Sequence, residues 1–271
     1  MRSILVHADN DAASEGRYQV AFDLARHFEG HVTLMIATPL QQFVSFDPFG
    51  GTYFAAEALA KAQADDLALE SRLADRLAKE DVPWTIEMAD GDIIGGLAGA
   101  AVLADLTIVS LPHKQHDLRQ GPPMLAGDLA LATPVPVLAL PGAAKTMDFD
   151  APALIAWNGS TQAAQALRAA LPLPGGGRRV VLVAVGAEEE GAFSGTDALR
   201  YLSRHGIGAG LDVMDRGTAP IAERLEQEAR SLDAGLIVLG AFGHGRLRET
   251  LFGGTTRDML KNSQFPLLLA H

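Results

Sequence analysis

Short runs of hydrophobic residues alternate with longer amphipathic segments along almost the whole chain. The runs at residues 3–7, 31–37 and 106–111 are rich in Ile, Leu and Val, as is typical of parallel strands that are buried on both faces. Between such runs, at residues 12–28 and 55–80, apolar residues recur at the spacing of an amphipathic helix. Strands that alternate with helices in this way predict an α/β fold, with a parallel sheet flanked by helices.

The same order of elements occurs twice, which predicts two tandem domains at residues 1–141 and 151–271 with a short linker at 142–150. The remaining strands are expected at 83–88, 135–140, 153–157, 179–185, 209–214, 236–239 and 266–270. The remaining helices are expected at 92–103, 124–132, 160–171, 196–205, 220–232 and 256–263, with Asp92 and Ser160 as N-caps. We therefore expect two doubly wound, Rossmann-like domains, each with a five-stranded parallel sheet.

The repeat is also visible in the residues themselves. An offset of 130 residues aligns 104–110 with 234–240, and it aligns 135–140 with 265–270. This period is longer than that of solenoid repeats, so it indicates a duplicated domain. A chain of 271 residues, of which 48% are hydrophobic, is long enough to bury two substantial cores.

Glycines and threonines follow the apolar run at 236–239 and precede the last expected helix. The candidates for a site are Gly240, Gly243, Gly253, Gly254, Thr255 and Thr256. A glycine loop between a buried strand and a helix allows backbone N–H groups to approach an anion, and the start of the helix adds a partial positive charge. The threonine hydroxyls can cap the helix or contact the anion. The alternative is a glycine-rich turn that only reverses the chain.

This loop resembles the nucleotide loop of the universal stress protein family, and the repeated order of elements resembles two copies of the domain of that family. The resemblance implies the adenine nucleotide alpha hydrolase-like fold, with ATP, or otherwise ADP or AMP, bound by the second half. It implies Mg only if the ion is carried by the nucleotide. By the same resemblance, Ala156, Trp157 and Asn158 contact the ligand after the first strand, and Val185 and Leu239 contact it from two neighbouring strands.

Two positions of the second half depart from the pattern of the family. Asn158 stands where nucleotide-binding members have an acidic residue, so it can form hydrogen bonds but contributes no charge. Gly254 stands where Ser or Thr is usual, and the threonines that follow can supply the missing hydroxyl. Asn158 followed by Gly159 and Ser160 also fits an ordinary turn and helix cap, and this alternative stays open.

The first half lacks the loop. Ser110, His113 and Pro123 stand at the offset positions of the first three loop glycines, and their side chains, or the missing N–H of proline, oppose a close backbone approach. Asp9 keeps the acidic position after the first strand. We expect a degenerate site in this half, kept as a scaffold or altered for another ligand.

Composition excludes several classes of function. The net charge of −11 comes without a block of Lys and Arg, so nucleic acid is not an expected partner. The chain has no cysteine, which excludes disulfides and thiol chemistry. No run has the length of a membrane-spanning helix and the first strand begins too early for a signal peptide, so we expect no membrane partner and a cytoplasmic location.

The leading hypothesis is a stress-response or regulatory protein that binds an adenine nucleotide without efficient catalysis. The sequence has no G-x-S-x-G elbow, no Walker A lysine and no H-E-x-x-H motif, so slow ATP hydrolysis is the most that we expect. One alternative is a structural or interaction module that binds no nucleotide. Another is an enzyme of the wider superfamily, such as an adenylyl transferase, although the histidine signature of those enzymes is missing.

Two further expectations concern contacts between parts of the molecule. The last strands, at 135–140 and 266–270, should pair and join the halves as an intramolecular pseudo-dimer, because an exposed apolar edge would invite aggregation. A homodimer stays open as well. The aromatic segment at 38–54 is either a lid or partner surface, or a loop folded onto its own domain.

Overall fold

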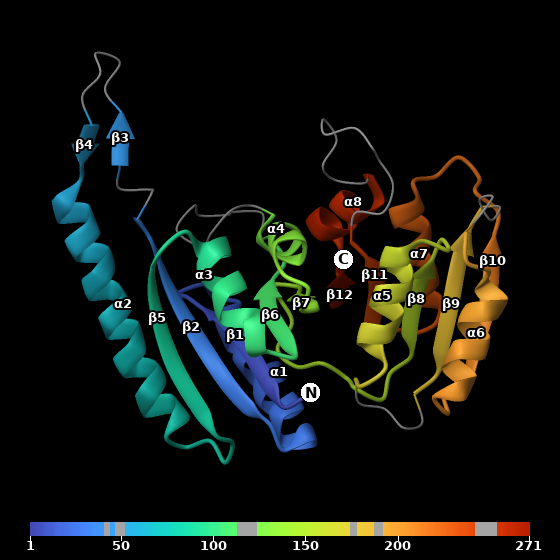
Figure 1. The fold of residues 1–271 in the computed structure, drawn as a ribbon, viewed down its shortest axis with the longest axis horizontal. Helices are drawn as coiled ribbons and strands as arrows, with labels where there is room; N and C mark the ends of the chain where they lie inside the picture. The colour runs from blue at the N-terminus through green and yellow to red at the C-terminus, as the bar shows by residue number, and fades with distance from the viewer. Residues whose placement is uncertain (41–43, 47–51, 113–123, 174–177, 187–191, 242–253) are drawn as a thin grey trace.

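The computed structural model describes residues 1–40, 44–46, 52–112, 124–173, 178–186, 192–241 and 254–271 (Figure 1). The first half contains β1 (Ser3–Ala8), α1 (Ser14–Phe28), β2 (His31–Pro39), β3 (Val44–Phe46), β4 (Thr52–Phe54), α2 (Ala56–Leu77), β5 (Trp84–Gly91), α3 (Ile93–Ala100), the 3-10 turn η2 (Ala101–Leu103), β6 (Leu106–Ser110), α4 (Leu125–Ala132) and β7 (Val137–Leu140). The second half contains β8 (Ala153–Trp157), α5 (Thr161–Ala170), β9 (Val180–Val185), α6 (Gly195–Arg204), β10 (Ala209–Met214), α7 (Ile221–Ser231), β11 (Leu236–Gly240), α8 (Gly254–Asn262) and β12 (Leu267–Ala270).

Ten strands from both halves form one sheet in the order β10-β9-β8-β11-β12-β7-β6-β1-β2-β5, and β3 and β4 form a separate two-stranded sheet. Within each half of this sheet all neighbouring strands are parallel, which confirms the expected α/β class with its mostly parallel sheet. The halves join where β12 pairs antiparallel with β7, and Leu268 lies opposite Leu138. The expected contact between the last strands is therefore present, while the domain limits at 141 and 151 stay a prediction.

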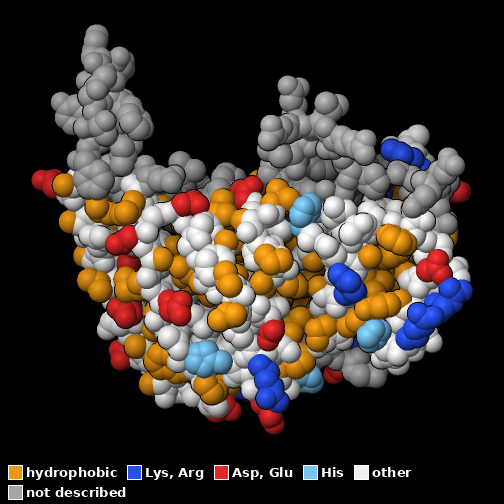
Figure 2. Space-filling model, viewed as in Figure 1, with side chains coloured by type: hydrophobic (Ala, Val, Ile, Leu, Met, Phe, Trp, Pro, Cys, Tyr) orange, Lys and Arg blue, Asp and Glu red, His pale blue; other side chains and the backbone are white. Residues whose placement is uncertain are grey.

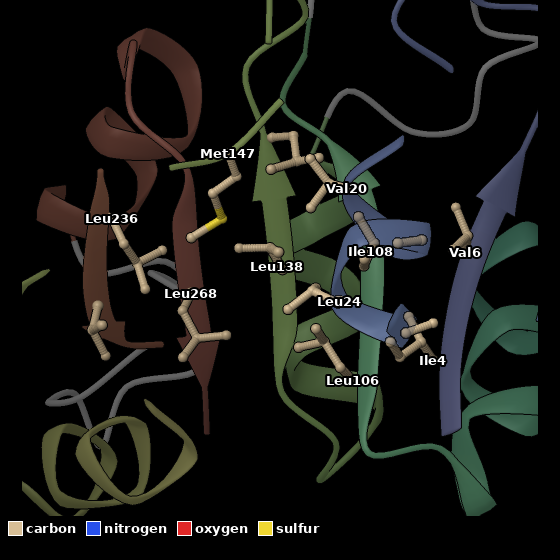
Figure 3. Close-up of a cluster of buried hydrophobic side chains, with 14 of the residues drawn as sticks. Ile4, Val6, Val20, Leu24, Leu106, Ile108, Leu138, Met147, Leu236 and Leu268 are labelled. Carbon is tan, nitrogen blue, oxygen red and sulfur yellow. The ribbon is translucent and has the colours of Figure 1, made fainter. Parts of the chain in front are cut away.

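Helices cover both faces of the sheet, and the core has two layers. One layer packs the sheet against α1, α2, α5 and α6, and the other packs it against α3, α4, α7 and α8. The first layer crosses the junction between the halves, where Leu138, Leu268 and Met147 of the linker lie close together (Figure 3). Burial of each such aliphatic side chain contributes about 1.5–3 kcal/mol, so the junction is stabilised as a continuous core rather than as a surface contact.

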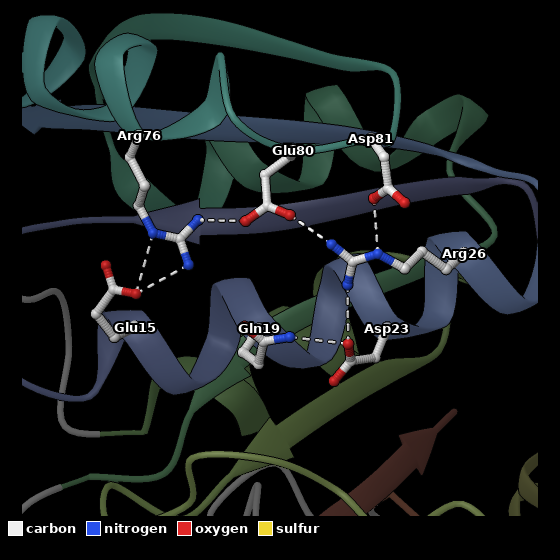
Figure 4. A network of polar contacts seen from close by, with 7 residues as sticks. All are labelled: Glu15, Gln19, Asp23, Arg26, Arg76, Glu80 and Asp81. Atoms are coloured by element: carbon white, nitrogen blue, oxygen red, sulfur yellow. Dashed lines mark hydrogen bonds and ion pairs between the residues drawn. The ribbon is translucent and has the colours of Figure 1, made fainter.

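Surface ion pairs connect α1 with the end of α2 (Figure 4). Arg26 of α1 donates to Asp81 at 2.8 Å and to Glu80 at 2.5 Å, and Arg76 of α2 donates to Glu80 at 3.4 Å and to Glu15 at 2.9 Å. Glu80 thus links the two arginines. The network lies at the surface, where Glu15 and Asp81 are largely exposed and the other side chains are partly exposed, so each pair contributes about 1 kcal/mol or less to stability.

The structure differs from the expected elements in a few places. β3 and β4 form an antiparallel hairpin inside the aromatic segment at 38–54, which was expected to be a loop; the side chains of 41–54 lie outside the described part. Helix α8 begins at Gly254 rather than at residue 256, so the two residues before Thr256 belong to its first turn. The predicted caps are confirmed, because Asp92 accepts from the Gly95 N–H at 2.8 Å and Ser160 Oγ accepts from the Ala163 N–H at 3.1 Å. None of the helices described here combines the length and hydrophobicity needed to cross a bilayer.

Candidate functional site

A cavity of about 250 Å³ lies at the carboxyl ends of β8, β9 and β11. β8 is flanked by β9 on one side and β11 on the other, so the cavity sits at the point where the strand order of the second half reverses, as predicted. The predicted residues that line it are Ala156, Trp157, Asn158, Val185, Leu239, Gly240, Gly254, Thr255 and Thr256. The predicted Gly243 and Gly253 lie outside the described residues.

The walls of the cavity are mostly apolar. Val183 and Val185 alternate on β9 and face the same side, while Ile221 and Leu225 are four residues apart on α7 and close the cavity from above the sheet. Sequence reasoning found Val185 but missed the other three, although the two-residue period of β9 and the four-residue spacing on α7 could have indicated them. A slot with such walls suits a flat, apolar group of a ligand.

Asn158 forms the turn that leads into α5 and also lines the cavity. Its Oδ1 accepts from the Ser160 N–H at 3.2 Å and from the Ser160 hydroxyl at 2.7 Å, which uses both lone pairs of the amide oxygen. Because the backbone N–H of Ser160 can only donate, the atom of the Asn158 amide that faces it is the oxygen. The turn-and-cap interpretation is therefore confirmed, and the Nδ2 group of this exposed side chain remains as a donor at the rim of the cavity.

Trp157 is a wall of the cavity and not a free donor. The indole is buried, and its Nε1–H donates to the carbonyl of Phe193 at 3.1 Å. The Phe193 N–H in turn donates to the carbonyl of Gly159 at 2.9 Å. Gly159 has φ +70, and a Cβ there would lie 2.6 Å from the Phe193 carbonyl oxygen, so only glycine fits. The turn after β8 is thus held rigidly against the segment before α6.

Two of the predicted glycines have different physical roles. A Cβ on Gly240 would lie 2.5 Å from the backbone nitrogen of Ala163, so glycine is required here for the close packing of α5 on β11. A Cβ on Gly254 would meet no atom within 4 Å in the part of the chain that the structure describes. Gly254 lies with Thr255 and Thr256 in the first turn of α8, whose N–H groups and partial positive charge are at the cavity.

The equivalent place in the first half contains an internal ion pair. The pairing of Ile4 with Leu106 corresponds to that of Ala153 with Leu236, which puts Asp9 at the position of Asn158. The Arg17 guanidinium extends from α1 across this place. It donates to Asp9 Oδ1 at 2.5 Å, to Ser110 Oγ at 2.6 Å and to the His7 carbonyl at 3.1 Å. The retained acidic residue is therefore bound to a residue of its own domain.

Burial sets the protonation of this cluster. Burial lowers the pKa of His7 to about 4, although Asp9 at 3.4 Å opposes that shift, so the imidazole is neutral at pH 7. Burial alone would raise the pKa of Asp9, but the charge of Arg17, together with hydrogen bonds from Arg17 and from the Asp11 N–H, lowers it overall. At neutral pH the cluster consists of a carboxylate, a guanidinium and a neutral imidazole. Within the described residues, no group of three His, Asp or Glu side chains is placed to hold a metal ion.

Comparisons with known proteins agree with this architecture. Residues 212–271 match the model of the universal stress protein family. No curated protein matches the sequence of the chain. The matched segment contains β11, α8 and β12, together with the glycine positions from 240 to 254, so the family signature covers the side of the cavity that α8 provides.

Solved structures share the fold over nearly the whole chain. A universal stress protein from Archaeoglobus fulgidus DSM 4304 is 13% identical with a TM-score of 0.70, and the match covers 99% of this chain and 96% of that one. A candidate universal stress protein from Pseudomonas aeruginosa UCBPP-PA14 is 18% identical with a TM-score of 0.59, over 100% of this chain and 93% of that one. A protein of unknown function from Pseudomonas aeruginosa PAO1 is 17% identical with a TM-score of 0.60, over 100% and 92%.

Proposed function

We propose that this chain is a cytoplasmic stress-response protein whose second half binds an adenine nucleotide. The premise is that the chain has the universal stress protein fold over its whole length and matches the sequence model of that family in residues 212–271. ATP is the expected ligand, with ADP and AMP as alternatives. The observation that carries the proposal is the cavity at the carboxyl ends of β8 and β11, because nine residues predicted from the sequence line it.

The chemistry of the cavity fits the two parts of such a ligand. The apolar slot between Val185, Leu225 and Leu239 suits a purine ring, and the Nδ2 group of Asn158 can donate to an oxygen of the ribose or a nitrogen of the base. The start of α8 supplies backbone donors and a partial positive charge for phosphate. Among the described residues, no atom lies within 4 Å of a Cβ built on Gly254, which supports this placement.

The first half does not offer the same fit. Arg17 spans the equivalent crevice and uses its donors on Asp9, Ser110 and the His7 carbonyl. A nucleotide would have to break this buried ion pair, and leaving one charge buried without its partner costs about 3–5 kcal/mol. We therefore expect one nucleotide per chain, bound in the second half.

The lining of the cavity supports binding rather than chemistry. Its described side chains include hydroxyls of Ser160, Thr255 and Thr256, but no carboxylate and no imidazole that could act as a general base. Hydrolysis would then rely on an unassisted water and would be slow. An interaction module without a nucleotide is the second candidate function, favoured by the neutral Asn158 in place of an acidic residue.

One experiment separates the two candidates. The protein is purified natively and denatured, released nucleotides are identified by mass spectrometry, and ATP is then titrated into the stripped protein by calorimetry. Val185→Trp, which fills the slot, should weaken binding at least about tenfold, or about 1.4 kcal/mol. Ala37→Trp at the equivalent position of β2 is the matched control and should leave binding unchanged. No released nucleotide and no heat of ATP binding would favour the interaction module.

A further inference from the structure

A second cavity lies at the opposite edge of the sheet of the second half. Its volume is about 260 Å³, and it is lined by Ala153, Val180 and Leu236, which are the first residues of β8, β9 and β11. The candidate nucleotide cavity lies at the carboxyl ends of the same three strands. The two cavities therefore lie at opposite ends of the strands, and the second one needs an explanation of its own.

The walls of this cavity are mostly aliphatic. Leu167 and Ala170 of α5 and Leu202 of α6 line it. His205 and Gly208 line it as well and are exposed, so the cavity opens to water at the end of α6. It is slightly smaller than the roughly 300–1,000 Å³ of cavities that hold drug-sized ligands, so it suits the apolar part of a small molecule.

The first half fills the same layer of the core with larger side chains. α1 and α5 occupy equivalent places, between the first and second strands of their halves. α1 buries Tyr18 and Phe22 in this layer, whereas α5 buries Ala163 and Ala166. The cavity therefore follows from the side chains of the second half and not from the fold that both halves share.

Arg178 brings a cation to this aliphatic cavity. Its Nε and Nη2 atoms are buried, and no described group forms a hydrogen bond with either of them. The two atoms lie on the same edge of the planar guanidinium, so their N–H groups form one half of a fork that matches a carboxylate. Buried donors of a charged group are unfavourable without partners, so this edge lacks the acceptor that would satisfy it.

Two acidic residues lie near Arg178 but do not satisfy this edge. Burial lowers the pKa of Arg178 to about 10, although the charges of Asp148 and Asp150 raise it. Asp148 Oδ1 accepts instead from the N–H groups of Asp150 at 2.9 Å and Ala151 at 3.2 Å. Arg178 is therefore a cation at neutral pH, and its Nε and Nη2 donors remain for a ligand.

The surface around the cavity favours an anion, although the chain as a whole has a net charge of −11. Figure 2 shows Lys and Arg side chains over α5 and α6, whereas acidic side chains predominate over the first half. Arg168 and Arg204 lie in the last turns of α5 and α6. Their charges offset the partial negative charge of the helix ends and raise the local concentration of an anion.

We propose that this cavity binds a small monocarboxylate with an apolar tail, such as a medium-chain fatty acid. The two carboxylate oxygens accept from Nε and Nη2 of Arg178 as a bidentate pair. The tail lies against Ile155, Leu167 and Leu202, where its apolar surface is removed from water. The site is separate from the nucleotide cavity, so this proposal does not depend on nucleotide binding.

Calorimetric titration of octanoate into the full-length protein tests the proposal, with 1-octanol as the uncharged comparison. We expect one octanoate site per chain with a dissociation constant below about 1 mM, and at least about tenfold weaker binding of octanol. Arg178→Met should weaken octanoate at least about tenfold and leave octanol within about threefold, because it removes only the charge and the donors. Arg179→Met is the matched control at the next, exposed position, and it should leave octanoate within about threefold.

The thermal midpoint separates ligand binding from a purely structural role of Arg178. Because its two buried donors have no partner, Arg178→Met should keep or raise the thermal midpoint. An arginine that served only to attract Asp148 would show the reverse, with a lower midpoint and unchanged octanoate affinity. That result would overturn the proposal, as would equal affinities for octanoate and octanol, or no octanoate binding at millimolar concentrations.

Two further variants locate the bound octanoate. Ala170→Leu adds apolar volume to the wall of the cavity with a good helix former, so it should weaken octanoate and octanol alike, at least about tenfold. Val185→Trp fills the slot at the other end of the strands and should leave octanoate within about threefold. Octanoate that responds to Val185→Trp and not to Ala170→Leu would lie in the other cavity, which would overturn the proposal.

Discussion

Gly254 offers the sharpest test of phosphate binding, because a change there can separate the stability of α8 from the affinity for an anion. A Cβ at this position meets no atom of the described residues within 4 Å, so Gly254→Asp clashes with none of them. A carboxylate in the first turn stabilises a helix by about 0.3–1 kcal/mol. The same carboxylate beside a bound phosphate, at about 4 Å, costs between about 1 kcal/mol in bulk water and about 4 kcal/mol near a protein surface.

We therefore expect Gly254→Asp to weaken ATP binding at least about tenfold while the thermal midpoint stays the same or rises. Gly254→Asn is the matched control, since it has nearly the same size but no charge, and it should change affinity by less than about threefold. Calorimetric titration with ATP and with adenosine, at one ionic strength, measures both effects. Adenosine lacks phosphate, so its affinity should not respond to the aspartate. An equal loss for adenosine and ATP, or no loss for ATP, would refute the placement of phosphate at α8.

Three further predictions concern the glycine loop and the buried cluster. Gly243→Val and Gly253→Val should each weaken nucleotide binding at least about tenfold, because a branched side chain opposes the approach of backbone N–H groups to phosphate. Their circular dichroism spectra should stay native, and full affinity in both variants would mean that the loop is only a turn. Arg17→Met should lower the free energy of unfolding by about 3–5 kcal/mol, because it leaves the Asp9 carboxylate buried without its partner. Urea denaturation measures this change, and a loss below about 1 kcal/mol would show that the ion pair does not stabilise the fold. Acidification should destabilise the protein between pH 6.5 and about 4, because His7 has a folded pKa of about 4 and the unfolded chain takes up the proton first. The loss is about 3 kcal/mol, and His7→Gln should remove it; an unchanged slope in that variant would assign the acid sensitivity elsewhere.

Most helices and strands of the fold could be predicted, because the spacing of hydrophobic residues along the chain distinguishes the two kinds of element. Strands buried on both faces, such as β8 and β11, stand out as continuous apolar runs between helical segments. The hairpin of β3 and β4 could not be read in this way, because its strands are short and lie among glycine and proline. The start of α8 was misplaced because glycine and threonine both oppose helix formation by propensity, and tertiary packing overrides that preference.

The candidate site was predictable where it depends on position along the chain and not where it depends on contacts across the fold. The ends of β8 and β11 meet because of the topology, which the order of elements implies. The role of Gly240 in packing α5 was not predictable, because it depends on the path of a helix that a sequence does not specify. The same holds for Arg17, since nothing in its neighbours along the chain indicates that it reaches Ser110, 93 residues away.

The covalent linker makes the association of the two halves across the antiparallel junction of β7 and β12 independent of protein concentration. Two separate domains joined by this contact would dissociate on dilution, whereas the covalent linker keeps each half at a high effective concentration around the other, of the order of millimolar for short flexible linkers. One half can then change at this place, where the first half has the Arg17 ion pair, without being lost from the assembly. The duplicated chain thus has one half free to change its chemistry while it continues to complete the sheet of the other.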